Sequence, residues 1–343
     1  MQRVESLQIL ARVLLMAALP ALGGGPAAKA AKAPAPSKLV IVATIPPIHS
    51  LAARVMAGVG RPRLLLARGS SPHDYALKPS DARALSRASL VIWVGPGLES
   101  FLARPLKTLA RNAEKLALLG VPGLHLRRAR TGGVWPVGEG EKGHGPGQVG
   151  GQVAGQVGGQ TKGLNIDPHI WLDPGNAITM VGAIARALGR ADPANKARYA
   201  ANARRAVVTL TALDRRLARR LAPIRRVPYI VFHDAYGYFE GRYGLSAVAA
   251  VAVNAARRPG IRRIRAIRAR LKHAGAACVF TEPQFSPALA ATLTEGSGAR
   301  IGILDPIGME LTPGPELYPA LLTGLGQALV SCLSPGKGRT RPR

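Results

Sequence analysis

The chain has 343 residues, with 47 Lys and Arg against 18 Asp and Glu, so its formal net charge is +29. Such a charge raises the question of a nucleic-acid or anionic-membrane partner. The basic residues are scattered along amphipathic helical segments, however, and only 4% of residues are Phe, Trp or Tyr. Because no basic stripe is interleaved with aromatic residues that could stack on bases, the composition argues against nucleic-acid binding and favours an arginine-rich, solvated surface.

The N-terminal segment has the features of an export signal. A weakly basic stretch leads into a short apolar run at residues 13–22, and small residues in the A-x-A form follow at 28–30 and 31–33. We predict a signal peptide over residues 1–33 that is cleaved on export, with a buried N-terminal helix as the alternative. No Cys follows the apolar run, and no later window is apolar for the ~18 residues of a transmembrane helix. The expected product is a soluble periplasmic protein without a lipid anchor.

The first half of the chain alternates short β-branched runs with helical stretches, which is typical of an α/β fold with mostly parallel sheets. We expect strands at 39–44, 63–67 and 90–94, and helices near 49–57, 79–86 and 100–112. These elements predict a doubly wound N-terminal lobe over residues 38–190.

Residues 131–163 interrupt this lobe with repeats of Gly, Gln and Val. Such a tract cannot bury enough apolar surface to offset its ordering entropy, so we expect a disordered surface loop. An interdomain linker is the weaker alternative, because residues 166–172 on its far side have the character of a further strand of the same lobe.

The second half begins with a long helical pattern of Ala, Leu and Arg at residues 195–221, which at 1.5 Å per residue spans roughly 40 Å. We assign residues 191–224 to a helix that links two lobes. Beyond it, strands are expected at 229–232, 247–251, 277–280 and 301–304, with a closing helix at 315–332. This alternation predicts a second doubly wound lobe over residues 225–335. Two domains also suit the roughly 310 residues that follow the signal.

The chain has two cysteines, Cys278 and Cys332. In an exported protein they suggest one disulfide that ties a late strand to the C-terminal helix, with two free buried thiols as the alternative. Two cysteines are too few for a zinc finger built on thiolates.

Polar side chains follow several predicted strands at their carboxyl ends, where open α/β sheets bind ligands. His233, Glu282 and Asp305 each come directly after a strand of the second half, and His73 lies a short loop beyond the strand at 63–67. His169 ends the first lobe. Neutral imidazoles together with carboxylates suit a cation such as zinc, but the long intervals between the histidines leave core histidines as the alternative.

At these same residues the sequence resembles a known family, the zinc-specific solute-binding proteins of ABC importers. This is the ZnuA type of metal-receptor cluster A-I, in periplasmic solute-binding protein family 9. The resemblance runs from about residue 39 to residue 333. Its most specific segments are 70–81 (SSPHDYALKPSD), 91–96 (VIWVGP), 167–174 (DPHIWLDP), 231–239 (VFHDAYGYF), 280–285 (FTEPQF) and 304–308 (LDPIG).

The resemblance implies that His73, His169 and His233 bind Zn²⁺ in a cleft between two lobes joined by a rigid helix. It places Asp305 as a fourth ligand or a close neighbour of the metal. In manganese relatives the position of His233 is typically a glutamate, so a third imidazole favours zinc. The family also implies delivery to a membrane permease, a monomeric receptor without catalysis, and a disulfide at Cys278 and Cys332.

The chain departs from the family at two places. Pro72 stands where zinc members often carry a glutamate, and residues 138–163 offer few of the His, Asp and Glu residues that crowd the corresponding loop elsewhere. We further expect Asp234 and Glu282 to hydrogen-bond the ligand imidazoles. A manganese or iron receptor of the same architecture is the alternative, and a zinc hydrolase with Glu282 as base is a more distant one.

Overall fold

The computed structural model describes residues 39–66, 69–130, 134, 165–252 and 259–334. The predicted signal peptide and nearly all of the predicted loop at 131–163 lie outside the described residues. Among the helices of the described residues, none has both the length and the apolar character needed to cross a bilayer.

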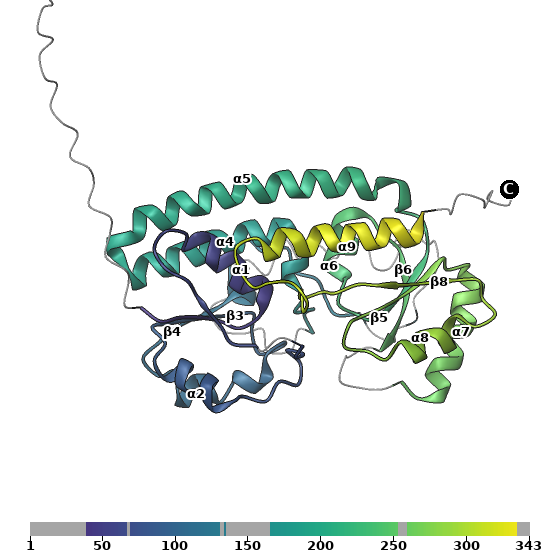
Figure 1. Cartoon of the computed structure of the whole chain (residues 1–343), viewed down its shortest axis with the longest axis horizontal. Coiled ribbons are helices and arrows are strands. Elements are labelled where there is room, and N and C mark those ends of the chain that lie inside the picture. The colour runs from purple at the N-terminus through teal and green to yellow at the C-terminus, as the bar shows by residue number, and fades with distance from the viewer. Residues whose placement is uncertain (1–38, 67–68, 131–133, 135–164, 253–258, 335–343) are drawn as a thin grey trace, which may run out of the picture. The chain divides into compact units, whose positions relative to one another are not determined.

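The first half forms a four-stranded parallel sheet (Figure 1). Its order is β2-β1-β3-β4, built from β1 (Ile41–Ala43), β2 (Arg63–Leu64), β3 (Leu90–Trp93) and β4 (Glu114–Ala117). Alternate residues of β1 and β3 enter two different apolar clusters, because successive side chains of a strand point to opposite faces. Helices α1 (Pro46–Val55) and α4 (Pro174–Ala191) cover one face, and α2 (Pro79–Ser86) and α3 (Pro105–Thr108) cover the other. The sheet is therefore doubly wound, as predicted.

The second half repeats this arrangement with sheet order β6-β5-β7-β8. Its strands are β5 (Tyr229–His233), β6 (Ala247–Ala252), β7 (Cys278–Thr281) and β8 (Arg300–Ile303), all parallel to their neighbours. Helices α7 (Ile261–Ala274) and α8 (Pro287–Thr294) pack on one face, and α6 (Gly237–Tyr243) and α9 (Leu317–Leu333) on the other. The predicted fold of two parallel α/β lobes is confirmed.

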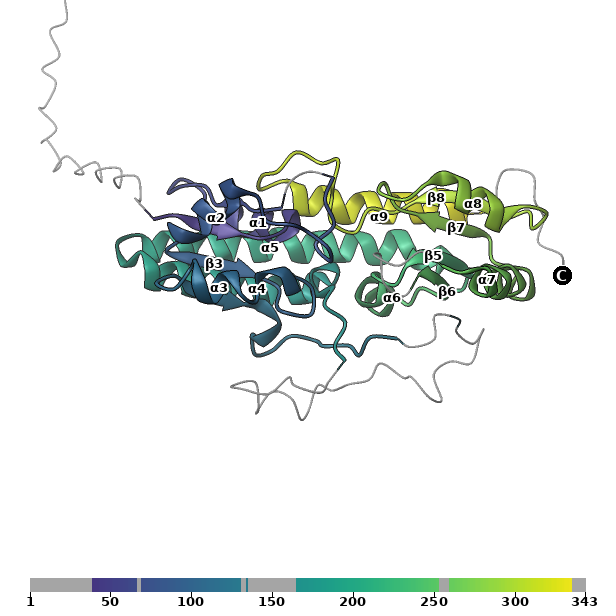
Figure 2. The ribbon, with the colours of Figure 1, turned by 90° about the horizontal axis from the view of Figure 1, so that it is seen from below.

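Helix α5 (Lys196–Leu221) runs past both sheets (Figures 1 and 2). Its buried positions recur at helical spacing, from Tyr199 through Leu210 to Leu221, and they share one apolar cluster with β1, β5 and α9. Short 3₁₀ turns, η4 (Pro193–Asn195) and η5 (Ala222–Ile224), flank the helix. A single apolar core therefore continues through both halves along α5, and our domain limits at 190/191 and 224/225 stay predictions.

Two local predictions are wrong, and one strand was missed. The helix expected at 100–112 is two short pieces, η1 (Ser100–Leu102) and α3, because Pro105 cannot donate the backbone bond of a continuous helix. The strand expected at 166–172 is a single bridge at Ile166 followed by η3 (Ile170–Leu172), with Pro168 between them. Strand β4 was not predicted, since its residues are only partly buried and its apolar pattern is weak. A further 3₁₀ turn, η2 (Leu118–Gly120), follows it.

The disulfide between Cys278 and Cys332 is present. It joins β7 to the last turns of α9, so the prediction that it ties a late strand to the C-terminal helix is confirmed.

A buried carboxyl, Glu99, closes the turn that follows β3. It accepts hydrogen bonds from the Thr44 hydroxyl and from the backbone N–H groups of Val94 and Gly95. Burial outweighs these bonds, which favour the ionised form, and raises the pKa of Glu99 from 4.5 to about 7. The turn therefore carries an acid that is half protonated near neutral pH.

Glu99 is expected to make the protein less stable as the pH rises. Below pH 4.5 the carboxyl is protonated in both the folded and the unfolded state; between pH 4.5 and 7 only the unfolded chain releases its proton, so unfolding becomes more favourable. Between pH 5 and 8 the free energy of unfolding should fall by ~2.5 kcal/mol more than that of the non-titrating variant Glu99→Gln. Urea unfolding at the two pH values measures this difference. If the free energies of unfolding of the wild type and of Glu99→Gln changed equally with pH, burial would not hinder the ionisation of Glu99.

Candidate metal centre

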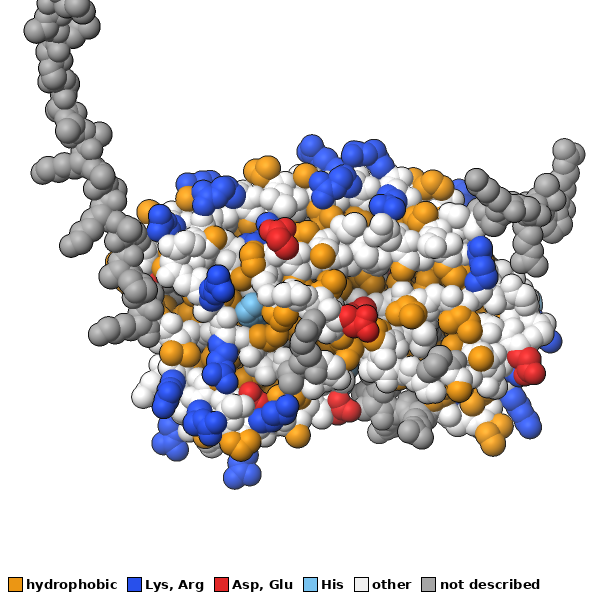
Figure 3. Space-filling view, in the orientation of Figure 1, with side chains coloured by type: hydrophobic (Ala, Val, Ile, Leu, Met, Phe, Trp, Pro, Cys, Tyr) orange, Lys and Arg blue, Asp and Glu red, His pale blue; other side chains and the backbone are white. Residues whose placement is uncertain are grey.

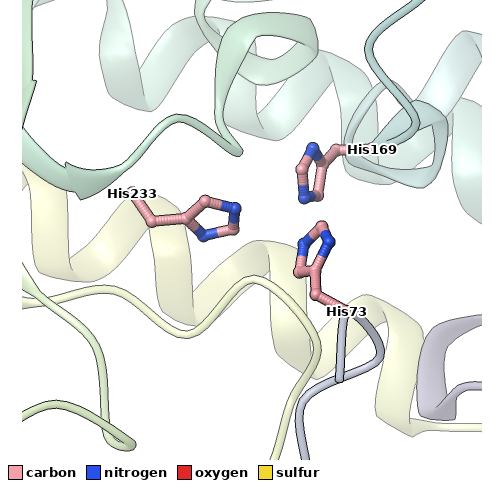
Figure 4. Close-up of side chains that lie close together, drawn as sticks. All are labelled: His73, His169 and His233. Carbon is pink, nitrogen blue, oxygen red and sulfur yellow. The ribbon is translucent and has the colours of Figure 1, made fainter. Parts of the chain in front are cut away.

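Three histidines from separate parts of the chain converge (Figure 4). His73 lies in the loop between β2 and α2, His169 directly precedes η3, and His233 is the last residue of β5. One ring nitrogen of each lies within 4.8 Å of those of the other two, and the ring centroids are 5.0 to 5.5 Å apart. The site thus receives His73 from a loop of the first half and His233 from a strand of the second, although these residues are far apart in sequence.

Two of the imidazoles are held by carboxylates at their Nδ1 atoms. His169 Nδ1 lies 2.7 Å from Asp167 Oδ1, and His233 Nδ1 lies 3.1 Å from Glu282 Oε1. A carboxylate at Nδ1 fixes that nitrogen as the protonated one and leaves Nε2 with a free lone pair for a metal. In His73 the Nε2 atom is buried and has no hydrogen-bond partner among the described residues. All three rings can therefore offer a neutral nitrogen to one ion.

The electrostatics of the three rings differ. Burial, together with the neighbouring histidines, lowers the pKa of His73 and of His169 to about 3. Burial also opposes a charge on His233, but the adjacent Glu282 carboxylate outweighs it and raises the pKa of His233. A metal binds only deprotonated imidazole, so two of the three nitrogens need no proton release at neutral pH.

The structure does not bring Asp305 into this group. Its carboxylate accepts hydrogen bonds from the backbone N–H groups of Ile307, Gly308 and Met309, at 2.6 to 3.1 Å. These bonds hold the turn that follows β8. Asp305 as a ligand stays a prediction, and it would have to exchange some of these bonds for the metal.

Of the two residues expected to orient the imidazoles, Glu282 does so and Asp234 does not. Asp234 instead forms an ion pair with Arg130, which also donates to Glu240 at 2.7 Å. Asp167, which orients His169, was missed; the spacing Asp167-Pro-His169 carried the signal, because a carboxylate two residues before a histidine can fold back onto its ring in a tight turn. Asp167 also accepts the backbone N–H of His169.

The two halves touch beside the site. Trp171 Nε1, in η3, donates to the carbonyl of Pro306 at 2.7 Å, and the Tyr318 hydroxyl of α9 donates to the carbonyl of Trp171. A hollow of about 500 Å³ is lined by residues of the loop 69–78, which flank His73 in sequence, and by Gln284 and Phe285 from the second half. His169 and His233 themselves are buried.

Two parallel α/β lobes with a histidine cluster between their strand ends define a class of proteins, the metal receptors of the solute-binding type. A crystal structure of ZnuA superposes with a TM-score of 0.69 at 23% sequence identity, and the match covers 87% of this chain and 100% of that chain. The manganese-bound solute-binding protein FpvC of Pseudomonas aeruginosa superposes equally well, with a TM-score of 0.69 at 23% identity over 87% of this chain and 99% of that chain. The fold alone therefore does not choose the metal.

Sequence comparison gives the family. The model of the family described as zinc-uptake complex component A periplasmic (ZnuA) matches residues 41–332. The high-affinity zinc uptake system protein ZnuA of Brucella suis biovar 1 (strain 1330) is 42% identical over 307 residues, covering 86% of this chain and 91% of that protein. The protein of the same name from Paracoccus denitrificans (strain Pd 1222) is 43% identical over 314 residues, covering 90% and 95%. The chain belongs to the ZnuA family, and the family prediction is confirmed.

Proposed function

We propose that this chain is the zinc receptor of an ABC importer: it captures Zn²⁺ in the periplasm and delivers it to the membrane permease. The observation that carries the proposal is the group of three imidazole nitrogens within 4.8 Å of one another. Nitrogen ligands suit zinc better than manganese, which prefers carboxylate oxygens. Membership of a family of zinc-uptake proteins supports the same metal over manganese or iron.

His73, His169 and His233 are the ligands in this proposal, each through one ring nitrogen. Zinc in proteins is most often four-coordinate, so a fourth oxygen completes the shell, either from Asp305 or from water. Asp167 and Glu282 hold two of the rings in place, which reduces the ordering that binding would otherwise require. The receptor acts as a monomer.

The hydrolase alternative needs a free carboxylate near the metal to act as a base, and Glu282 was its candidate. In the structure one oxygen of Glu282 faces His233 Nδ1, and the other accepts a hydrogen bond from Gln284 Nε2 at 2.6 Å. The side chain is also buried. Because both oxygens are occupied in orienting other groups, this carboxylate is poorly placed to accept a proton from a metal-bound water. This favours a receptor over an enzyme.

Delivery of zinc to the permease is tested by replacing the gene for this chain in its native host with a variant gene. A host that expresses the variant His73→Ala/His169→Ala/His233→Ala should grow as poorly as a deletion strain when a chelator limits zinc, whereas the wild-type chain should restore growth. Added zinc should restore the growth of the triple-variant strain and of the deletion strain, and added manganese should restore the growth of neither. Growth of the triple variant under zinc limitation would contradict the proposal.

A further inference from the structure

The end of α5 and the turn that follows it carry a dense cluster of arginines that the metal site does not use. We name the arginine cluster as Arg215, Arg216, Arg219, Arg220, Arg225 and Arg226, all of them exposed. The helix contains one acidic residue, Asp214, and that carboxylate pairs with Arg242 of α6. No carboxylate among the described residues lies within ion-pair distance of the cluster. Lys and Arg side chains line the edge of the molecule along which α5 runs (Figure 3).

The arrangement of the cluster is unfavourable for the isolated helix. Arg215 and Arg219, and likewise Arg216 and Arg220, are four residues apart and therefore repel each other on the helix surface. The helix dipole favours cations in the last turn only. Three of the arginines, together with Leu213, Leu217 and Thr323 of α9, line a hollow of about 400 Å³. A bound anion would relieve the repulsion at this place.

The outward face of α5 also carries an apolar residue among these cations. Val208 is 71% exposed, and at 100° per residue it falls on the same stripe as Arg204, Arg215 and Arg219. The wide apolar face of α5 packs in the core, so this outward face would attract an anionic lipid surface through its cations, with Val208 as its one exposed aliphatic contact. The one aromatic residue of α5, Tyr199, is buried, so this face offers no platform for stacking nucleic-acid bases.

We propose that the arginine cluster and the outward face of α5 bind the anionic phospholipid surface of a membrane. Guanidinium groups recognise phosphate in a bidentate manner, and a lipid surface presents many phosphodiesters to the six arginines at once. The hollow whose lining flanks His73 in sequence is formed by the residues that lead into α2 and α8, and these helices lie on the side of the molecule opposite α5 (Figure 1). A chain that is bound through α5 therefore keeps this hollow turned away from the lipid surface.

Vesicle co-sedimentation of the full mature chain tests this surface. The variant Arg215→Gln/Arg216→Gln/Arg219→Gln/Arg220→Gln should bind mixed phosphatidylglycerol and phosphatidylcholine vesicles at least about 100-fold more weakly than the wild type at low salt. The matched control removes four exposed cations of the first lobe, as Arg87→Gln/Arg104→Gln/Lys107→Gln/Arg111→Gln. This control should bind within about threefold of the wild type, and both variants should keep the zinc affinity of the wild type. The wild type should ignore pure phosphatidylcholine and should be released as salt is raised.

Three outcomes would overturn the proposal. Equal losses in the two variants would mean that net charge, and not the arginine cluster, attracts the lipid. Undiminished binding of the cluster variant would place the surface elsewhere. A wild-type chain that binds duplex DNA or inorganic phosphate through the cluster but leaves the vesicles in solution would have a different anion as its partner.

Discussion

Replacing His233 with Ala is expected to weaken zinc binding by ~10²- to 10³-fold. Structural zinc sites at neutral pH are worth roughly 10 to 16 kcal/mol in total, so one of about four ligands accounts for ~3 to 4 kcal/mol. His233 is buried at the end of β5. Among the described residues, no fourth histidine belongs to the converging group, so no other imidazole can take its place as a ligand. Competition with a chromophoric chelator measures the affinity.

The matched control is His273→Ala, which removes an exposed histidine from the last turn of α7. It should leave the zinc affinity unchanged. His169→Ala should resemble His233→Ala, because the two rings are held in the same way by a carboxylate at Nδ1. Circular dichroism of each variant establishes that it is folded. A folded His233→Ala protein that keeps the affinity of the wild type would place the metal elsewhere.

Removal of the disulfide is expected to lower the free energy of unfolding by ~4 kcal/mol. Cys278 and Cys332 are separated by 54 residues, and the cross-link restricts the unfolded chain by an amount that grows slowly with this loop length. The variant Cys278→Ala/Cys332→Ala should therefore unfold at a markedly lower guanidinium concentration. Its zinc affinity should stay within about threefold of the wild type, because β7 and α9 are still held together by the shared apolar core.

Reduction of the wild type with dithiothreitol serves as the control and should produce nearly the same loss as the double substitution. A loss below ~1 kcal/mol in both cases would mean that the unfolded chain is already compact around these segments. A loss of zinc binding in the double variant would show that the disulfide also supports the metal site.

The parts of the fold that sequence predicted well are those with strong periodicity. The buried strands of both sheets and helix α5 carry long apolar patterns, and each lies close to its predicted place. Strand β4, from Glu114 to Ala117, is a half-buried edge strand, and its charged residues hide the pattern. The continuous helix predicted across Pro105 is wrong although its apolar pattern was clear. The apolar residues have helical spacing, and only the proline indicated a break.

The candidate site was predictable to a similar extent. Ligands collect at the carboxyl ends of parallel strands, and this rule together with the family motifs singled out His73, His169 and His233. The residues that orient them depend on turn geometry, which sequence spacing does not give. Asp167 reaches back to His169 within one turn, whereas Asp234, which adjoins His233 in sequence, points to Arg130 instead. Asp305 lies after its strand as expected, but its backbone partners are visible only in the structure.

The most direct test of the receptor is the metal stoichiometry of the purified mature chain, measured by mass spectrometry after equilibration with zinc and a large excess of manganese. The three converging imidazoles predict one zinc per chain that manganese does not displace, and loss of that zinc in the triple variant His73→Ala/His169→Ala/His233→Ala. Bound manganese in place of zinc, or one zinc retained by the triple variant, would contradict the account.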